Sequence, residues 1–179
     1  MRVAICSYGA GNVRSVGLAF ERLGARLTDD VAGADLAVLP GVGSARAAMA
    51  GLRRSGLDEV LRARVDADRP VLGICLGLQL ALDETEEDGG VAGLGLVPGR
   101  AVRLRGGRVP RIGWADVEPH GETFYFAHSY AAETRCATAT SEGIVAAARS
   151  GSFTGVQFHP EKSGAAGARF LESLCLSLV

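Results

Sequence analysis

The first half of the chain repeats one pattern three times: a short apolar run, a glycine-containing turn, and a segment with apolar residues at helical spacing. The apolar runs and the helical segments alternate over residues 3–6, 13–23, 35–39, 57–65, 70–74 and 76–82. Continuous apolar strands that alternate with helices imply a mostly parallel sheet covered on both faces. We therefore predict a three-layer α/β fold, in which ligands bind at the carboxyl ends of the strands.

The second half of the chain has a different pattern of apolar residues. Residues 89–155 form short alternating segments separated by many glycines, which indicates antiparallel strands, and helical spacing returns over residues 165–178. No internal repeat, low-complexity linker or charge block divides the chain. Its 179 residues are enough to form one well-packed core. We therefore expect residues 1–179 to form a single domain.

Composition excludes several classes of protein. Hydrophobic residues make up 47% of the chain and the formal net charge is -1, so neither disorder nor a nucleic-acid-binding surface is indicated. There is neither an apolar run long enough to span a membrane nor a signal-peptide pattern, so we expect no membrane association and a cytoplasmic location. The four cysteines form no Cys-x-x-Cys pair, which argues against both a disulfide framework and a zinc site.

Cys75 has the surroundings of a nucleophile. It lies in Gly73-Ile74-Cys75-Leu76-Gly77, the form Gly-x-nucleophile-x-Gly, between an apolar strand and a helical segment. Such a turn exposes the sulfur at the edge of the sheet, and the N-terminal amides of the helix favour the thiolate. The amide of Leu76 would face a developing oxyanion. The other three cysteines are expected to be core thiols.

A nucleophilic cysteine requires a base, and the chain offers His120, His128 and His159. An alternating pattern over residues 156–158 delivers His159 to the end of a strand, and Pro160 holds it extended. Glu161 would then project to the same side as His159 and orient its ring, as in a triad. His120 lies in a turn composition and is expected to be exposed. His128 either lines the pocket or satisfies a buried backbone group.

Three motifs occur in order along the chain, at residues 40–43, 73–79 and 159–161. Together they resemble those of the class I, triad-type glutamine amidotransferases. More narrowly, the stretches at residues 8–16, 93–99, 125–130 and 155–163 are similar to those of the glutaminase subunits of imidazole glycerol phosphate synthases. The resemblance implies a flavodoxin-like fold of the amidotransferase type.

The resemblance also implies a chemistry. Cys75 attacks the carboxamide of glutamine, His159 protonates the departing ammonia, and water releases glutamate from the thioester. The segment Val42-Gly43 supplies oxyanion-hole amides, after a peptide rearrangement if need be. No metal or organic cofactor is implied. Four residues match positions that hold the amino-acid end of the substrate: Gln79, Glu87, Ser129 and Tyr130.

A second protein is implied as well. The family partner is a cyclase subunit with a (β/α)8 barrel, which forms a heterodimer with the glutaminase and uses its ammonia. Residues that match positions near that interface are Asn12, Trp114, Tyr125 and Lys162. The chain departs from the family pattern at Arg111 and Ala115, in the stretch expected near the partner, and at Ala45, which follows the oxyanion loop.

Other interpretations of the same residues remain open at this stage. The acidic residues 86–88 could form a solvated turn, and Trp114 and Tyr125 could be core aromatics. The glutaminase could serve another synthase, such as one for surface-sugar amidination. A non-enzymatic regulatory or binding protein on the same fold, with Cys75 as a sensor, is a third possibility.

Overall fold

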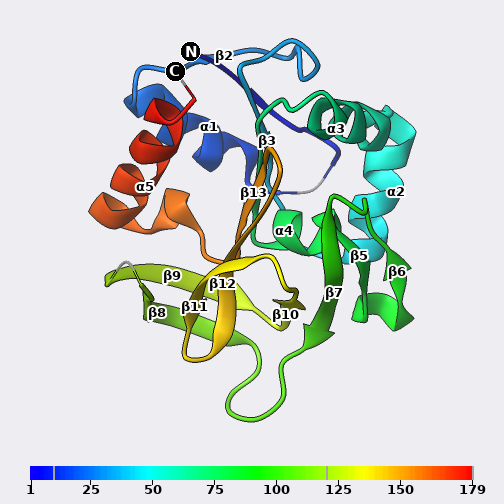
Figure 1. The fold of residues 1–179 in the computed structure, drawn as a ribbon, viewed down its shortest axis with the longest axis vertical. Helices are drawn as coiled ribbons and strands as arrows, with labels where there is room; N and C mark the ends of the chain where they lie inside the picture. The colour runs from blue at the N-terminus through cyan, green and yellow to red at the C-terminus, as the bar shows by residue number, and fades with distance from the viewer. Residues whose placement is uncertain (10, 120, 179) are drawn as a thin grey trace.

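The computed structural model describes residues 1–9, 11–119 and 121–178, and its fold is shown in Figure 1. Within these residues the largest sheet has seven strands in the order β11-β12-β13-β4-β3-β1-β2. Their bounds are β1 (Arg2–Ile5), β2 (Arg26–Leu27), β3 (Leu36–Leu39), β4 (Val71–Ile74), β11 (Ala137–Ser141), β12 (Ile144–Ser150) and β13 (Phe153–Val156). The pairs from β13 to β2 are parallel, whereas β11 and β12 are antiparallel. The predicted mostly parallel α/β fold is confirmed.

Helices cover both faces of this sheet (Figure 1). Helices α1 (Val13–Arg22) and α5 (Gly164–Leu176) lie on one face, and α2 (Ala45–Ser55) and α3 (Leu57–Asp66) on the other. The apolar side chains separate in the same way. Phe20 and Leu171 belong to one core cluster, and Met49 to another. Burial of both sheet faces explains why the central strands are continuously apolar.

Two smaller sheets complete the described part of the chain. One has the order β10-β7-β5-β6 and the other is the hairpin of β8 and β9. Their bounds are β5 (Leu82–Thr85), β6 (Val91–Ala92), β7 (Val97–Arg103), β8 (Arg111–Val117), β9 (Glu122–His128) and β10 (Tyr130–Glu133). Most pairings in this half are antiparallel, as expected, but β7 pairs in parallel with β5, and β13 with β4. None of the described helices has the length and apolar character that crossing a bilayer requires.

One expected helix boundary was wrong by one residue, and one short strand was missed. The helix expected over residues 76–82 is α4 (Leu76–Ala81), because Leu82 already begins β5. Strand β2 was not predicted: its residues Arg26 and Leu27 are exposed, and the strand is defined by backbone pairing with β1 rather than by an apolar pattern. Of the cysteines expected in the core, Cys6 is fully buried, while Cys136 and Cys175 are half-buried.

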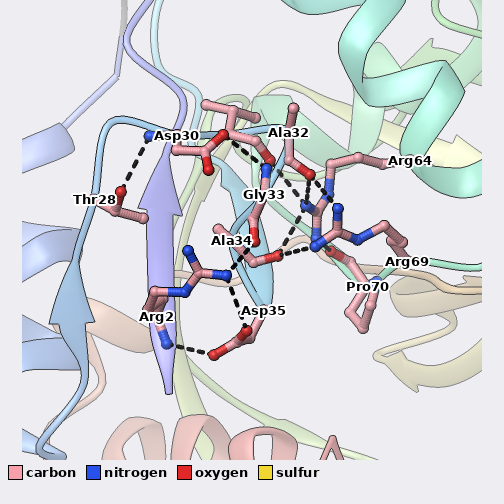
Figure 2. Close-up of polar contacts among 11 residues, drawn as sticks. Arg2, Thr28, Asp30, Ala32, Gly33, Ala34, Asp35, Arg64, Arg69 and Pro70 are labelled. Carbon is pink, nitrogen blue, oxygen red and sulfur yellow. Dashed lines mark hydrogen bonds and ion pairs between the residues drawn. The ribbon is translucent and has the colours of Figure 1, made fainter.

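A buried cation holds the loop that precedes β3 (Figure 2). The Arg64 guanidinium donates hydrogen bonds to the carbonyl oxygens of Val31 at 2.8 Å, Ala34 at 3.0 Å and Pro70 at 2.8 Å. Arg64 is 2% exposed. Because Arg64 lies on α3, these bonds tie that helix to the segments that enter β3 and β4. Arg64 therefore anchors the chain just before the two strands whose carboxyl ends flank the site.

Candidate active site

The turn at Cys75 has the geometry of an elbow. Cys75 follows β4, precedes α4, and has φ 54° and ψ -108°, a backbone conformation that costs a non-glycine residue about 1–3 kcal/mol. The flanking glycines are explained by close packing rather than by positive φ. A Cβ at Gly77 would collide with the Leu39 carbonyl oxygen, and one at Gly73 would lie 2.6 Å from the Phe153 ring. The elbow therefore depends on contacts with the neighbouring strands.

The Cys75 sulfur has two polar neighbours. Its S–H donates to the Ala127 carbonyl oxygen across 3.7 Å, and the side-chain amide of Gln157 donates to the sulfur across 3.5 Å. Cys75 is 6% exposed. Gln157 was not predicted as a site residue, although it stands two positions before His159. That position in the motif was the only signal in the sequence that could have identified it.

His159 and Glu161 make the contact that the sequence predicts, but by a different route. The Nδ1 of His159 lies 2.9 Å from Oε1 of Glu161. Strand β13 ends at Val156, so His159 is not at a strand end. The two side chains meet because the backbone turns: His159 is extended, whereas Glu161 lies in the 3-10 helix η2 (Pro160–Lys162). The extended backbone expected at His159 is confirmed, but the expectation that it continues through Glu161 was wrong.

Hydrogen bonds to both backbone polar groups of His159 hold the residue in place. Its amide donates to the Tyr125 carbonyl oxygen at 2.9 Å, and its carbonyl oxygen accepts from the Ser163 hydroxyl at 2.6 Å. The Tyr125 amide in turn donates to the Ser163 hydroxyl at 3.0 Å. His159 is therefore positioned by strand β9 and by Ser163, which follows it in the chain.

The electrostatics favour a charged His159. Burial by itself lowers the pKa of His159, but the side chains of Cys75 and Glu161 beside the ring outweigh it and raise the pKa to about 9. The ring is therefore an imidazolium at neutral pH. Since Nδ1 faces Glu161, Nε2 is the nitrogen left to exchange a proton with the sulfur or with a leaving group.

A cavity of about 290 Å³ opens beside Cys75. Eight of the predicted site residues line it: Val42, Gly43, Cys75, Leu76, Gln79, Glu87, Ser129 and Tyr130. His159 and Glu161 lie outside the lining, with their side chains 3% and 2% exposed. A larger cavity of about 560 Å³, between α5 and the strands β8, β9, β11, β12 and β13, contains none of the predicted residues.

The residues predicted to hold the substrate also form hydrogen bonds with each other and with neighbouring residues. The side-chain amide of Gln79 donates to the Tyr130 carbonyl oxygen at 2.8 Å and to Oε1 of Gln157 at 3.0 Å. The Glu87 carboxylate accepts from the Ala45 amide at 3.1 Å, and burial raises the pKa of Glu87. The alternative of a merely solvated acidic turn is therefore wrong for Glu87.

His128 combines the two roles considered for it. It lines the cavity, and its Nδ1 lies 2.9 Å from the Tyr130 carbonyl oxygen. Burial lowers the pKa of His128 to about 4, so the ring is neutral at physiological pH and Nδ1 is the nitrogen that carries the proton. His120 lies outside the described residues.

The residues predicted near a partner gather around Tyr125, with one exception. Trp114 is 58% exposed and meets the Tyr125 ring edge-on at 5.9 Å, and Lys162 Nζ lies 6.0 Å from the same ring. Trp114 is thus no core aromatic. Asn12 instead caps α1, where its side chain accepts from the Ser15 amide at 3.3 Å.

The unusual Arg111 turns inward. Its guanidinium lies 4.3 Å from the centroid of the Phe126 ring and donates to the Ser141 hydroxyl at 2.8 Å and the Glu142 carboxylate at 2.9 Å. Ala115, the second departure, pairs with Phe124 across the hairpin. Arg111 therefore braces the hairpin from within instead of presenting its charge on the surface.

The parallel sheet, the cysteine elbow and the buried histidine–glutamate pair match the pattern expected of a class I glutamine amidotransferase. The family model described as glutamine amidotransferase class-I matches residues 20–177. The imidazole glycerol phosphate synthase subunit HisH of Symbiobacterium thermophilum is 43% identical, over 95% of this chain and 91% of the relative. The chain therefore belongs to the class-I glutamine amidotransferase family.

Two further comparisons bear on partner and fold. The chloroplastic imidazole glycerol phosphate synthase hisHF of Arabidopsis thaliana is 40% identical, over 94% of this chain but 33% of the relative. A crystal structure of a glutamine amidotransferase superposes with a TM-score of 0.78 at 22% identity, covering 98% of this chain and 97% of the other. The last comparison supports the fold alone.

Proposed function

We propose that this chain is the glutaminase subunit of an imidazole glycerol phosphate synthase, releasing ammonia from glutamine for histidine biosynthesis. The observation that carries the proposal is the cavity in which Cys75 meets the predicted substrate residues, with the His159–Glu161 pair behind it. The similarity to HisH subunits over nearly the whole chain supports the choice of synthase. By this proposal residues 1–179 act as one domain in the cytoplasm.

The proposed chemistry proceeds through a thioester. The Cys75 thiolate attacks the carboxamide carbon of glutamine, and the resulting oxyanion faces the amides of Leu76 and of the Val42-Gly43 segment. His159 donates its proton to the nitrogen, which leaves as ammonia. Water then attacks the thioester, His159 accepts a proton from it, and glutamate departs as the thiolate re-forms. Glu161 keeps the imidazole oriented throughout.

Gln79 and Glu87 are suited to the ammonium of the substrate. Both N–H donors of Gln79 are already used, so only its Oε1 acceptor is left for a ligand. One Glu87 oxygen accepts from Ala45, which leaves the other for the cavity. Two acceptors, one of them a carboxylate, match an ammonium group. Ser129 and Tyr130, which line the same cavity, complete the proposed subsite.

The proposed partner is a cyclase subunit with a (β/α)8 barrel, which forms a heterodimer with this chain. It would join ammonia to a phosphoribulosyl formimino aminoimidazole carboxamide nucleotide, giving imidazole glycerol phosphate and the aminoimidazole carboxamide ribotide. The complex would thus combine hydrolase and lyase activities. The Arabidopsis relative named hisHF, about three times as long as the matched part, supports a second unit. Residues proposed at this interface are Asn12, Trp114, Tyr125 and Lys162.

The test is to mix the chain with the candidate cyclase and its nucleotide, and to measure glutamate release. Cys75→Ala should abolish glutamine-dependent synthesis and leave ammonia-dependent synthesis intact, because only the nucleophile is lost. Absence of glutamate release by the wild-type complex would contradict the proposal. Loss of ammonia-dependent synthesis in Cys75→Ala would instead show that the substitution disturbs assembly.

Two further experiments test the alternatives to this proposal, a glutaminase that serves a different synthase and a non-enzymatic regulatory or binding protein. Failure to complement a histidine auxotroph, despite soluble expression beside a matched cyclase, would favour a different acceptor. A glutamine-analogue alkylator should label Cys75 in the complex. If Cys75 stays unlabelled even with partner and nucleotide bound, the non-enzymatic alternative is favoured.

A further inference from the structure

We propose that Gln157 is a positioning residue for the nucleophile: its side-chain amide donates a hydrogen bond that orients the Cys75 sulfur and stabilises the negative charge that the sulfur carries when it reacts. The inference rests on the proposed glutaminase function and adds to it a residue that acts through Cys75. The donor and the sulfur are 3.5 Å apart, and the two residues are 82 positions apart in the chain.

The placement of Gln157 leaves its side chain little freedom. It is 0% exposed, and its backbone amide donates to the Ala146 carbonyl oxygen of β12 at 2.8 Å. A buried primary amide needs partners for its donors and its acceptor, since an unpaired buried polar group costs about 1–3 kcal/mol. Here Oε1 accepts from Gln79 and Nε2 faces Cys75. The side chain is therefore committed to the site.

A relay of hydrogen bonds determines which end of the amide meets the sulfur. The Tyr130 carbonyl oxygen can only accept, so Gln79 must present its Nε2 there. The same Nε2 lies 3.0 Å from Gln157, which must therefore offer Oε1 as an acceptor. Gln157 is left with its N–H groups directed at Cys75. The backbone of Tyr130 thus fixes, through two glutamines, the donor at the sulfur.

The Gln157 donor affects the protonation of the Cys75 sulfur because the other polar neighbour of the sulfur has the opposite effect. The Ala127 carbonyl oxygen accepts from the S–H and so favours the protonated thiol. A donor favours the negatively charged sulfur instead. Without the Gln157 donor, the acceptor at Ala127 would remain, and the thiol would be favoured over the thiolate. Gln79 also lines the cavity, so the relay connects the substrate site to the nucleophile.

The experiment compares the pH dependence of Cys75 alkylation by iodoacetamide in the wild-type chain and in Gln157→Glu, with labelling read at Cys75 by mass spectrometry. The substitution keeps the shape and the acceptor for Gln79 but replaces the N–H donor with a carboxylate oxygen, so the uncharged variant Gln157→Leu is measured beside it. We expect the pH of half-maximal labelling to rise by about one unit or more. In the complex, kcat should fall about 100-fold and KM change less than about threefold, with ammonia-dependent synthesis retained.

Two further variants keep the result decisive. Gln157→Leu removes the donor without adding charge, and it decides the question if Gln157→Glu does not fold. Ser152→Ala, which removes a hydroxyl just before β13, should leave the labelling profile unchanged. An unchanged profile in a folded Gln157 variant would overturn the positioning role. Because labelling needs no glutamine turnover, that result is distinct from a wild-type complex that releases no glutamate, which would overturn the proposed function.

Discussion

Ser44 donates a hydrogen bond to the Asp88 carboxylate across 2.6 Å, and this contact ties the acidic turn to the start of α2. The same carboxylate accepts from the Arg46 amide at 3.0 Å. The 3-10 helix η1 (Glu87–Gly89) therefore caps a helix that begins two residues after Gly43. The proposed oxyanion segment and the proposed ammonium site are mechanically linked through this turn.

Asp88→Ala should lower the free energy of unfolding by about 1 kcal/mol, because two donors at the start of α2 lose their acceptor. The hydrogen bonds from Ser44 and Arg46 lower the pKa of Asp88. Its contribution is therefore present above the ordinary carboxyl pKa and is lost as the pH falls through the lowered value. Denaturant unfolding of both forms at neutral and acidic pH measures this. Equal sensitivity to acid in both forms would contradict the assignment.

Glu161→Gln should reduce kcat in the complex by about 100-fold or more with little change in KM. The substitution preserves size but removes the negative charge that orients and stabilises the His159 imidazolium. Steady-state glutamate release measures the effect. Glu142→Gln, which alters an exposed carboxylate bonded to Arg111, serves as a matched control and should retain activity. A Glu161→Gln enzyme with wild-type kcat would exclude the orienting role.

Glutaminase activity should fall as the pH rises through about 9. The pKa of His159 is raised to about 9, so the ring keeps its proton below that pH and loses it above. Loss of the proton removes the donor for departing ammonia. The stabilisation that comes with the raised pKa follows the same course: it is complete below the unfolded-state pKa of about 6.5 and disappears above about 9. Measuring kcat of the complex as a function of pH tests this decline at alkaline pH. In Glu161→Gln the decline should occur at a lower pH.

Arg64→Met should destabilise the fold by about 3 kcal/mol or more, because several buried carbonyl oxygens lose their donor at once (Figure 2). Arg69 donates to the neighbouring Ala34 carbonyl oxygen at 2.9 Å but is half-buried. Arg69→Met is therefore the matched control and should cost about 1 kcal/mol. Thermal and denaturant unfolding compare the two. A similar loss in both variants would show that burial of Arg64 adds nothing.

Local sequence patterns were sufficient to predict the fold class and to single out Cys75 as the proposed nucleophile. Both follow from local pattern: apolar runs that alternate with helical spacing specify a covered parallel sheet, and glycines around Cys75 specify a tight strand-to-helix turn. His159 contacts Glu161 and has an extended backbone, as expected, but the extended conformation expected to continue to Glu161 was wrong. A 3-10 turn of three residues leaves no periodic signal in the sequence.

The contacts around these residues became apparent only in the three-dimensional structure. The donor from Gln157 to Cys75 and the contact of Asp88 with Ser44 join positions 82 and 44 residues apart. Such pairs depend on how strands and turns are brought together, and no spacing rule along the chain encodes them. The physical reason is that periodicity reports which face of an element is buried, whereas hydrogen-bond partners are selected by three-dimensional packing.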